Sequence, residues 1–276
     1  MRRAAPIAAL AVLAATTLGT VSCAAPLLEL PAFPQRPSPT ADAATVLAEA
    51  TASCGTIRTL TAEIGVRGSV GRQRIRGRMI AGLETPDSVH LDAAAPFGES
   101  IFMFVAKGGR ATLLLPRDDR ALEDGAPAAV LEAVTGVPLD GRSLRLALTG
   151  CADASQVADI SSGGDRWRIG SGGQYFERTS PTAPWRMVAT VYQTAGRPAW
   201  QAEYRDFLNG LPRTVRFVSR QSGQFDLTLS LSGVEINTTL PSEAFELSIP
   251  PGTSPISLEE LRRSGPLATG ESADGR

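Results

Sequence analysis

Apolar and polar residues alternate along much of the chain, which is the pattern of β-strands that bury one face. The first such run places Leu60, Ala62, Ile64 and Val66 on the same face. Further runs follow, and turn-forming glycines separate several of them. The ten predicted strands span residues 60–67, 74–83, 88–94, 101–106, 111–115, 167–169, 185–191, 200–204, 215–217 and 225–231.

Four short segments carry helical signals instead. The first places Leu47, Ala50 and Cys54 on one stripe, with Thr40 as the predicted N-cap. The last opens with a Ser-x-x-Glu capping box that begins at Ser257. The predicted helices span residues 41–54, 127–135, 143–148 and 258–263.

Ten strands with one apolar face each present more hydrophobic surface than four short helices can cover. We therefore predict a mainly β fold of the α+β class, in which a curved antiparallel sheet forms a half-open barrel closed by a few helices. This shape tends to leave an apolar cavity between the sheet and the helices. The folded domain is expected to span residues 41–264, with a disordered tail over residues 265–276.

The first 22 residues have the layout of a secretory signal peptide. Arg2 and Arg3 precede an apolar run over residues 6–18, which is too short to span a membrane, and small residues precede Cys23. The end of the segment resembles a bacterial lipobox, in which the cysteine is diacylated and becomes the first residue of the mature protein. Thr20 departs from this pattern, because leucine is usual there. The alternative is an ordinary cleaved signal peptide in which Cys23 has no special role.

Lipidation at Cys23 predicts a protein that is held at a membrane in the cell envelope. Ala24 follows the cysteine, where the enterobacterial sorting system uses aspartate to retain a lipoprotein at the inner membrane. The expected location is therefore the periplasmic face of an outer membrane. Residues 23–40 contain five prolines and are predicted to form an extended tether between the lipid and the folded domain.

Cys54 and Cys151 remain as an even pair once Cys23 is lipidated. In an oxidising compartment we expect them to form a disulfide, although two buried free thiols are the alternative. The bond would close a loop of roughly 100 residues, for which loop-closure entropy gives about 4–5 kcal/mol of stabilisation.

Composition and charge argue against several functions. The formal net charge of −1 gives no sign of nucleic-acid binding. His90 is the only histidine and is predicted to lie on an outer strand face beside Asp92, so neither a catalytic triad nor a zinc site is expected. We therefore expect a protein that is not an enzyme and needs no metal or cofactor. An envelope hydrolase with clustered carboxylates is the alternative.

Three short stretches resemble the LolA/LolB superfamily of periplasmic lipoprotein carriers and receptors. They span residues 95–99, residues 131–139, which are similar to the helical insertion of the receptor LolB, and residues 245–250. The resemblance implies a half-barrel that binds acyl chains of lipids or lipoproteins without chemistry. It also implies a periplasmic carrier protein as a partner and the insertion of lipoproteins into the outer membrane.

In the receptor, an exposed apolar residue between the third and fourth strands helps to release cargo. Here the resemblance assigns that role to Phe97, unless its side chain folds back into the core.

An acyl-chain cavity needs flexible or aromatic side chains rather than polar contacts, because each buried methylene contributes about 0.8 kcal/mol. The side chains predicted to line it are Ile64, Ile75, Met79, Leu91, Phe102, Phe104, Trp167, Trp185 and Met187. The alternative is that these side chains form a solid core. The chain would then be a sensory or scaffolding lipoprotein that binds a protein partner.

Overall fold

The computed structural model describes residues 26–34, 39–95, 98, 100–194, 197–220 and 225–264. The first half of this chain contains strands β1 (Thr59–Val70), β2 (Gln73–Glu84), β3 (Ser88–Ala94), β4 (Ser100–Lys107), β5 (Arg110–Leu115) and β6 (Arg120–Gly125). The second half contains β7 (Ile160–Ser162), β8 (Trp167–Gly170), β9 (Gln174–Glu177), β10 (Arg186–Thr194), β11 (Arg197–Arg205), β12 (Thr214–Ser219), β13 (Phe225–Ile236) and β14 (Ser254–Pro255). The helices are α1 (Ala43–Thr51), α2 (Pro127–Thr135), α3 (Gly141–Thr149) and α4 (Leu258–Ser264).

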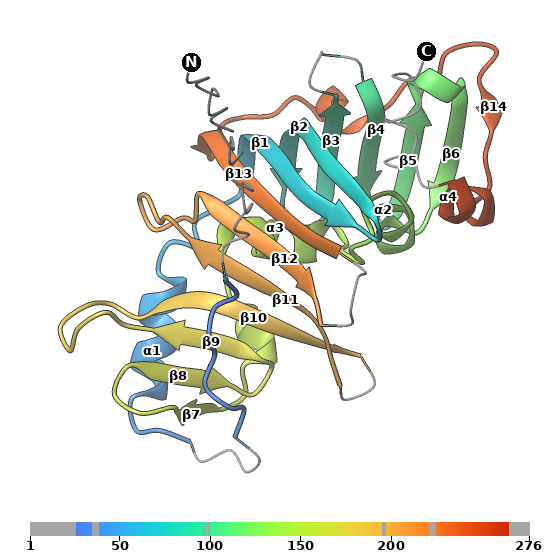
Figure 1. Ribbon diagram of the computed structural model, residues 1–276. Coiled ribbons are helices and arrows are strands. Elements are labelled where there is room, and N and C mark those ends of the chain that lie inside the picture. Colours follow the sequence, from blue (N-terminus) through green and yellow to red (C-terminus); the bar gives the residue numbers. More distant parts are fainter. Residues whose placement is uncertain are drawn as a thin grey trace, which may run out of the picture.

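All fourteen strands of the described residues belong to one curved sheet that does not close into a barrel (Figure 1). The strand order is β14-β6-β5-β4-β3-β2-β1-β13-β12-β11-β10-β9-β8-β7. Every pairing is antiparallel except that of β14 with β6. The predicted mainly β fold with an open, half-barrel sheet is therefore confirmed.

The two faces of the sheet are covered by different parts of the chain. Helix α1 contacts β10, α2 contacts β5, and α3 contacts β3. Figure 1 shows these helices behind the sheet, on the face that we call the inner face. Residues 26–34 cross the opposite, outer face over β8–β11.

The proline-rich segment is not a free tether over its whole length. Residues 26–34 contain neither helix nor strand, but Leu28 and Leu30 pack on an outer cluster of Ile169, Tyr175, Ala189 and Val191. The amide of Leu28 also donates a hydrogen bond to Oε1 of Glu203, at 2.8 Å. Burial of these two leucine side chains gives a favourable free energy that a fully solvated linker would not have, and it holds the segment on the sheet.

The four predicted helices are present, with different boundaries at the first. Helix α1 begins at Ala43 after the N-cap residue Asp42, so the predicted cap at Thr40 is wrong. The Thr40 hydroxyl instead donates to the carbonyl oxygen of Ile160, at 3.3 Å. The capping box of α4 is confirmed, since the Glu260 amide donates to Oγ of Ser257, at 3.2 Å. No helix in the described residues is long and apolar enough to span a membrane.

The predicted disulfide joins Cys54 to Cys151, with their Cα atoms 5.8 Å apart. Because α1 ends at Thr51, Cys54 lies just beyond that helix rather than on its buried stripe. Cys151 follows Gly150, which ends α3 in a left-handed conformation with φ of 65°. The bond therefore ties the segment after α1 to the end of α3.

A β-bulge explains one incorrect face assignment. In the strand predicted over residues 185–191, strict alternation would place Trp185, Met187, Ala189 and Val191 on one face, but the register shifts between Met187 and Ala189. Met187 consequently lies in the inner core, whereas Ala189 and Val191 lie in the outer cluster. One extra residue in a strand moves every following side chain to the other face.

Candidate functional site

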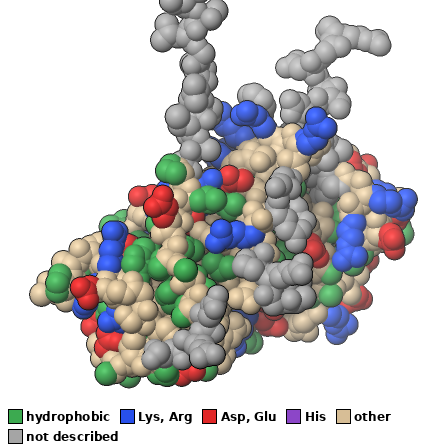
Figure 2. Space-filling view, turned by 60° about the horizontal axis from the view of Figure 1, so that its bottom comes forward, with side chains coloured by type: hydrophobic (Ala, Val, Ile, Leu, Met, Phe, Trp, Pro, Cys, Tyr) green, Lys and Arg blue, Asp and Glu red, His purple; other side chains and the backbone are tan. Residues whose placement is uncertain are grey.

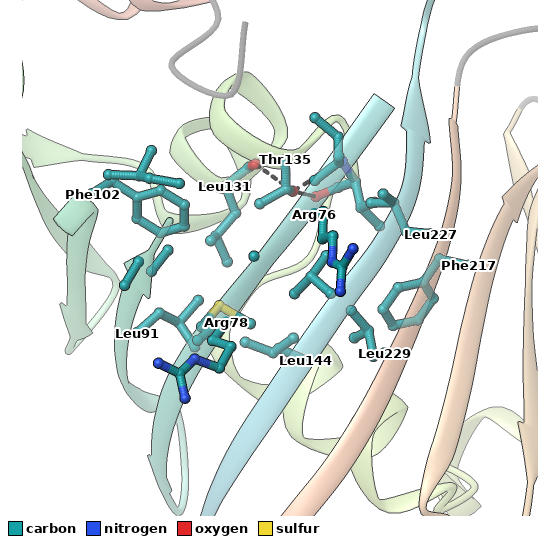
Figure 3. Close-up of a pocket in the computed structure, with 18 of the residues that line it drawn as sticks. Arg76, Arg78, Leu91, Phe102, Leu131, Thr135, Leu144, Phe217, Leu227 and Leu229 are labelled. Carbon is teal, nitrogen blue, oxygen red and sulfur yellow. Dashed lines mark hydrogen bonds between the residues drawn. The ribbon is translucent and has the colours of Figure 1, made fainter. Parts of the chain in front are cut away.

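An apolar cavity of about 90 Å³ lies between the inner face of the sheet and the α2–α3 segment. Figure 3 shows Leu91 and Phe102 on one side of it and Phe217, Leu227 and Leu229 on the other. Leu131 of α2 and Leu144 of α3 lie between these two walls. The cavity is thus bounded by strands that are far apart in the sequence and by the helical segment between them.

Strand alternation and one helix terminus place these side chains. Ile75 and Met79 of β2 face inward, and the glycine between them, Gly77, adds no side chain to the wall. Helix α2 ends at Gly136, whose φ of 77° is a conformation that glycine adopts readily. The chain turns there, and Val137 and Leu139 of the α2–α3 connection then complete the wall.

Among the described lining residues, no side chain presents a free polar group to the cavity. The Thr135 hydroxyl donates to the carbonyl oxygen of Leu131, at 2.7 Å. Arg76 and Arg78 border the cavity, but they alternate with the inward residues of β2 and their side chains are exposed on the outer face. The cavity can therefore bind the apolar part of a ligand and offers nothing for acid–base or nucleophilic chemistry.

The groups with the most strongly raised pKa lie away from this cavity. Burial raises the pKa of Tyr192 to about 12, and burial also raises the pKa of Tyr204 well above its ordinary value. Neither residue lines the cavity. These shifts therefore report packing beneath α3 rather than a reactive group in the cavity wall.

The mouth of the cavity lies beside β2. Strand β3 pairs with β2 only from Arg78 to Glu84, so residues 74–77 have no strand partner on that side among the described residues. Three lining side chains are half-buried: Val66 of β1, which is opposite Gly77, Met79 of β2 and Ile101 of β4. The cavity wall is therefore partly exposed near the point where the pairing of β3 with β2 ends.

The cavity must widen to hold a long ligand. Its volume of about 90 Å³ is below the roughly 150 Å³ of an engineered cavity that holds benzene. Met79 is unbranched and half-buried, so its side chain can move at low cost. Binding of a ligand larger than benzene would therefore require lining side chains such as Met79 to move.

Four of the nine side chains predicted to line a cavity do so, namely Ile75, Met79, Leu91 and Phe102. The other five lie elsewhere. Ile64 and Phe104 are on the inner face but are completely buried in solid core. Trp167 packs on the outer cluster, and Trp185 and Met187 lie in the inner core close to α1.

The surroundings of Trp185 show why it is not a cavity residue. The guanidinium groups of Arg168 and Arg178 each lie 4.7 Å from the centre of its ring system. Its amide donates to Oε2 of Glu49 in α1, at 3.0 Å. Cation–π contacts and the helix hold this tryptophan as part of the scaffold.

Fifteen lining residues were not predicted individually. Four of these, Arg76, Gly77, Arg78 and Ala94, lie at the rim, and the other eleven complete the wall. They are Val66, Ala93, Ile101, Leu131, Thr135, Val137, Leu139, Leu144, Phe217, Leu227 and Leu229. Four of them lie within residues 131–139, the stretch that resembles the insertion of LolB, and a fifth, Leu144, follows it. That stretch was the available signal, because the cavity needs an element to cover the sheet.

Two of the candidate residues, Cys23 and Phe97, lie outside the described residues. His90 does lie away from the cavity, since its Nδ1 is 2.6 Å from the carbonyl oxygen of Ala244. Within the described chain, no group of three or more His, Cys, Asp or Glu residues is arranged to hold a metal ion.

Comparison with known proteins bears on the fold alone. No family model matches the sequence, and no curated protein matches it significantly. Among solved structures, a LolA superfamily protein from Nitrosomonas europaea is similar, with a TM-score of 0.50 and 12% identity over 74% of this chain and 97% of that chain. The chain therefore has a LolA/LolB-like fold, and LolB itself is not singled out.

Two further likenesses are more distant. A domain assigned to outer membrane lipoprotein sorting in Vibrio parahaemolyticus gives a TM-score of 0.48 at 11% identity, covering 74% of this chain and 96% of that one. The lipoprotein LppX of Mycobacterium tuberculosis gives 0.33 at 11% identity, covering 71% and 98%.

Proposed function

We propose that this protein binds the acyl chain of a lipid or lipoprotein in the cavity beneath β2–β4, without catalysing a reaction. The observation that carries the proposal is the predominantly apolar lining, in which the one described hydroxyl, that of Thr135, is bonded to the backbone, and which includes half-buried side chains beside β2. An apolar site with a mouth suits a hydrocarbon chain whose polar head stays outside. The LolA/LolB-like fold supports the same use.

The proposal includes an anchor in the cell envelope. Acylation of Cys23 would hold the mature chain at a membrane, most simply on the periplasmic face of an outer membrane. Labelled palmitate in the growth medium should enter the wild-type protein and not the Cys23→Ser variant. Equal labelling of both proteins would contradict the anchor and leave the cavity proposal intact.

The most specific form of the proposal is a receptor role. The protein would accept lipoproteins from a periplasmic carrier and pass them to the outer membrane, with Phe97 as the membrane-touching residue. Replacing Phe97 by glutamate should then block delivery in cells while leaving binding of acyl chains unchanged. Normal delivery by this variant would restrict the function to lipid binding.

A matched pair of substitutions tests acyl-chain binding directly. Ala93 lines the cavity, whereas Ala189 is buried in the outer cluster beneath residues 26–34. In Ala93→Leu the added carbons occupy space for about two methylenes of ligand, which should weaken binding about tenfold. Ala189→Leu overpacks the scaffold and should lower stability without weakening binding.

Binding is measured with the fluorescent probe N-phenyl-1-naphthylamine and its displacement by a lysophospholipid, on variants shown by circular dichroism to be folded. The proposal predicts displacement in the wild type and in Ala189→Leu, and reduced affinity in Ala93→Leu. Equal affinity of all three proteins would show that the probe binds elsewhere. No binding to the wild type would favour a lipoprotein that binds a protein partner.

A further inference from the structure

The outer face of the β1–β2 hairpin carries an unusual density of positive charge. Arg67 lies on β1, Arg72 lies in the turn, and three arginines alternate along β2. We call these residues the arginine face, and they are Arg67, Arg72, Arg74, Arg76 and Arg78. All five are exposed, and none of them forms an ion pair with another described residue.

The register of the hairpin makes this arrangement unfavourable for the isolated fold. Arg67 is directly opposite Arg76 across the β1–β2 ladder. Like charges at directly opposed positions of an antiparallel pair destabilise the sheet. An external anion would remove this repulsion, so the arginines are suited to a partner of negative charge.

Outer-face arginines in the neighbouring strands are neutralised instead. Arg205 of β11 is 2.8 Å from Oε2 of the buried Glu203. Arg216 of β12 is 2.7 Å from Oδ2 of Asp226 on β13. These two outer-face arginines thus have acidic partners, whereas the arginine face on β1 and β2 has none among the described residues.

Three carboxylates lie near the arginine face without neutralising it. Asp226 is opposite Ser69, but Arg216 already binds its carboxylate. Glu63 and Asp92 lie farther along the hairpin, on either side of Ile80, and Asp92 accepts a hydrogen bond from Ser100 at 3.2 Å. The positive charge is thus concentrated towards the hairpin turn.

The arginine face adjoins the mouth of the cavity. Arg76 and Arg78 border the cavity, and residues 74–77 form the edge of β2 that has no partner in β3. Ile80, on the same outer face of β2, is the most exposed large apolar side chain among the described residues, at 59%. In the view of Figure 2, hydrophobic side chains reach the solvent between scattered Lys, Arg, Asp and Glu side chains.

The docked N-terminal segment reaches the same outer face. Arg205 donates to the carbonyl oxygen of Pro26, at 3.0 Å. The ladder leads from Arg205 through Thr214, Ser230 and Gly65 to Arg78. Four steps between strands amount to about 19 Å. The described chain thus begins on the outer face, within reach of the arginines.

From these positions we infer that the arginine face docks on a membrane surface that contains anionic phospholipids. Each guanidinium can bind a lipid phosphate through two parallel hydrogen bonds. Contact of this face with the headgroups would bring the edge of β2 that borders the cavity close to the bilayer. The inference rests on the proposed function for its purpose, the movement of an acyl chain between cavity and membrane, but membrane binding can be measured separately.

Vesicle flotation tests this inference. The protein is the mature chain from residue 23 with Cys23→Ser, so that no acyl group anchors it. One set of vesicles contains phosphatidylcholine alone, and the other contains equal parts of phosphatidylcholine and phosphatidylglycerol. We expect binding to the anionic vesicles only, and weaker binding as added salt shortens the Debye length from about 10 Å at 0.1 M.

The variant Arg74→Ser/Arg76→Ser should lower the partition coefficient about 25-fold, because each arginine near an anionic surface contributes about fivefold. The matched control is Arg262→Ser/Arg263→Ser on α4, which makes the same change in charge on another element. Equal losses in the two variants, or equal binding to both kinds of vesicle, would overturn the inference.

Probe binding in the cavity separates this inference from the proposed function. If Arg74→Ser/Arg76→Ser binds the fluorescent probe normally but loses the anionic vesicles, both statements hold. If the wild type binds the vesicles but never the probe, membrane docking stands and the acyl-chain proposal fails.

Discussion

Two regions of the same sheet use their faces in opposite ways. The packed region consists of β7–β11 and α1, where Phe176 and Ala202 are completely buried and α1 covers the inner face. The cavity region consists of β1–β4, β12, β13, α2 and α3, where the inner face leaves an apolar space and a half-buried rim. One region provides rigidity, and the other provides a site.

The outer faces differ in the same sense. Residues 26–34 cover the packed region, and the buried Glu203 binds both the Leu28 amide and Arg205. Within the cavity region, the β1–β2 hairpin leaves its outer arginines without acidic partners among the described residues, whereas Arg216 of β12 is paired with Asp226. The β1–β2 hairpin therefore combines two features that lack partners within the fold: an apolar cavity wall on its inner face and unpaired arginines on its outer face. Function should therefore be sensitive to that hairpin, and stability to the packed region.

The largest expected effect concerns the disulfide, which ties α1 of the packed region to α3. Its cysteines are separated by 97 positions in the sequence. The double variant Cys54→Ser/Cys151→Ser should lower the free energy of unfolding by about 3–5 kcal/mol, because the unfolded chain regains the entropy of a long loop. Urea unfolding monitored by circular dichroism measures the change. A loss below about 1 kcal/mol would show that the bond is not a main constraint on the scaffold.

Two leucines on the same helix compare the regions directly. Leu148 of α3 is 1% exposed in solid core, whereas Leu144 is 6% exposed and lines the cavity. Leu148→Ala should cost about 4 kcal/mol, and Leu144→Ala about 2 kcal/mol, because the second side chain already lacks neighbours on one side. Equal costs in urea unfolding would mean that the cavity wall is packed as tightly as the rest.

Removing the charge of Glu203 should have a smaller effect that is confined to the outer face. Glu203→Gln weakens the hydrogen bonds from Leu28, Gln201 and Arg205 and should cost about 2 kcal/mol. Hydrogen exchange of the Leu28 amide should accelerate, while the cavity strands stay protected. The control is the exposed residue Glu235, for which Glu235→Gln should change neither quantity. Unchanged exchange at Leu28 would contradict the docking.

The smallest effect is expected from pH. Hydrogen bonds from Ser257, together with Arg120, lower the pKa of Glu260 from 4.5 to about 2. A carboxylate with a lowered pKa in the folded state stabilises the fold above its ordinary pKa, and this contribution is lost as pH falls towards 2. The difference in Tm between wild type and Glu260→Gln should therefore be larger at pH 6 than at pH 2. A difference independent of pH would exclude this ionic contribution.

Alternation predicted the long strands well because each has one buried face. The inward set of β1, beginning with Leu60 and Ala62, is an example. The strands that were not predicted are short or polar: β6 reads Arg-Ala-Leu-Glu-Asp-Gly, β7 and β9 have three and four residues, and β14 has two. Such segments gain their strand conformation from neighbours in the sheet, which local sequence does not contain.

The cavity was harder to predict than the fold, because alternation gives the face of a side chain and not its position across the sheet. Ile64 and Phe104 face inward as Ile75 and Phe102 do, but core side chains surround them. The bulge at Met187 and the placement of Trp167 on the outer face depend on tertiary packing. The docking of Leu28 and Leu30 also could not be predicted from a proline-rich composition.

Native mass spectrometry tests the central claim most directly. The mature chain with Cys23→Ser is exported to the periplasm and purified without detergent. We predict an additional mass in the range of a phospholipid or acyl chain, which is lost on unfolding and reduced in Ala93→Leu but not in Ala189→Leu. A mass equal to that of the protein alone in repeated preparations would contradict acyl-chain carriage and favour a role in binding a protein partner.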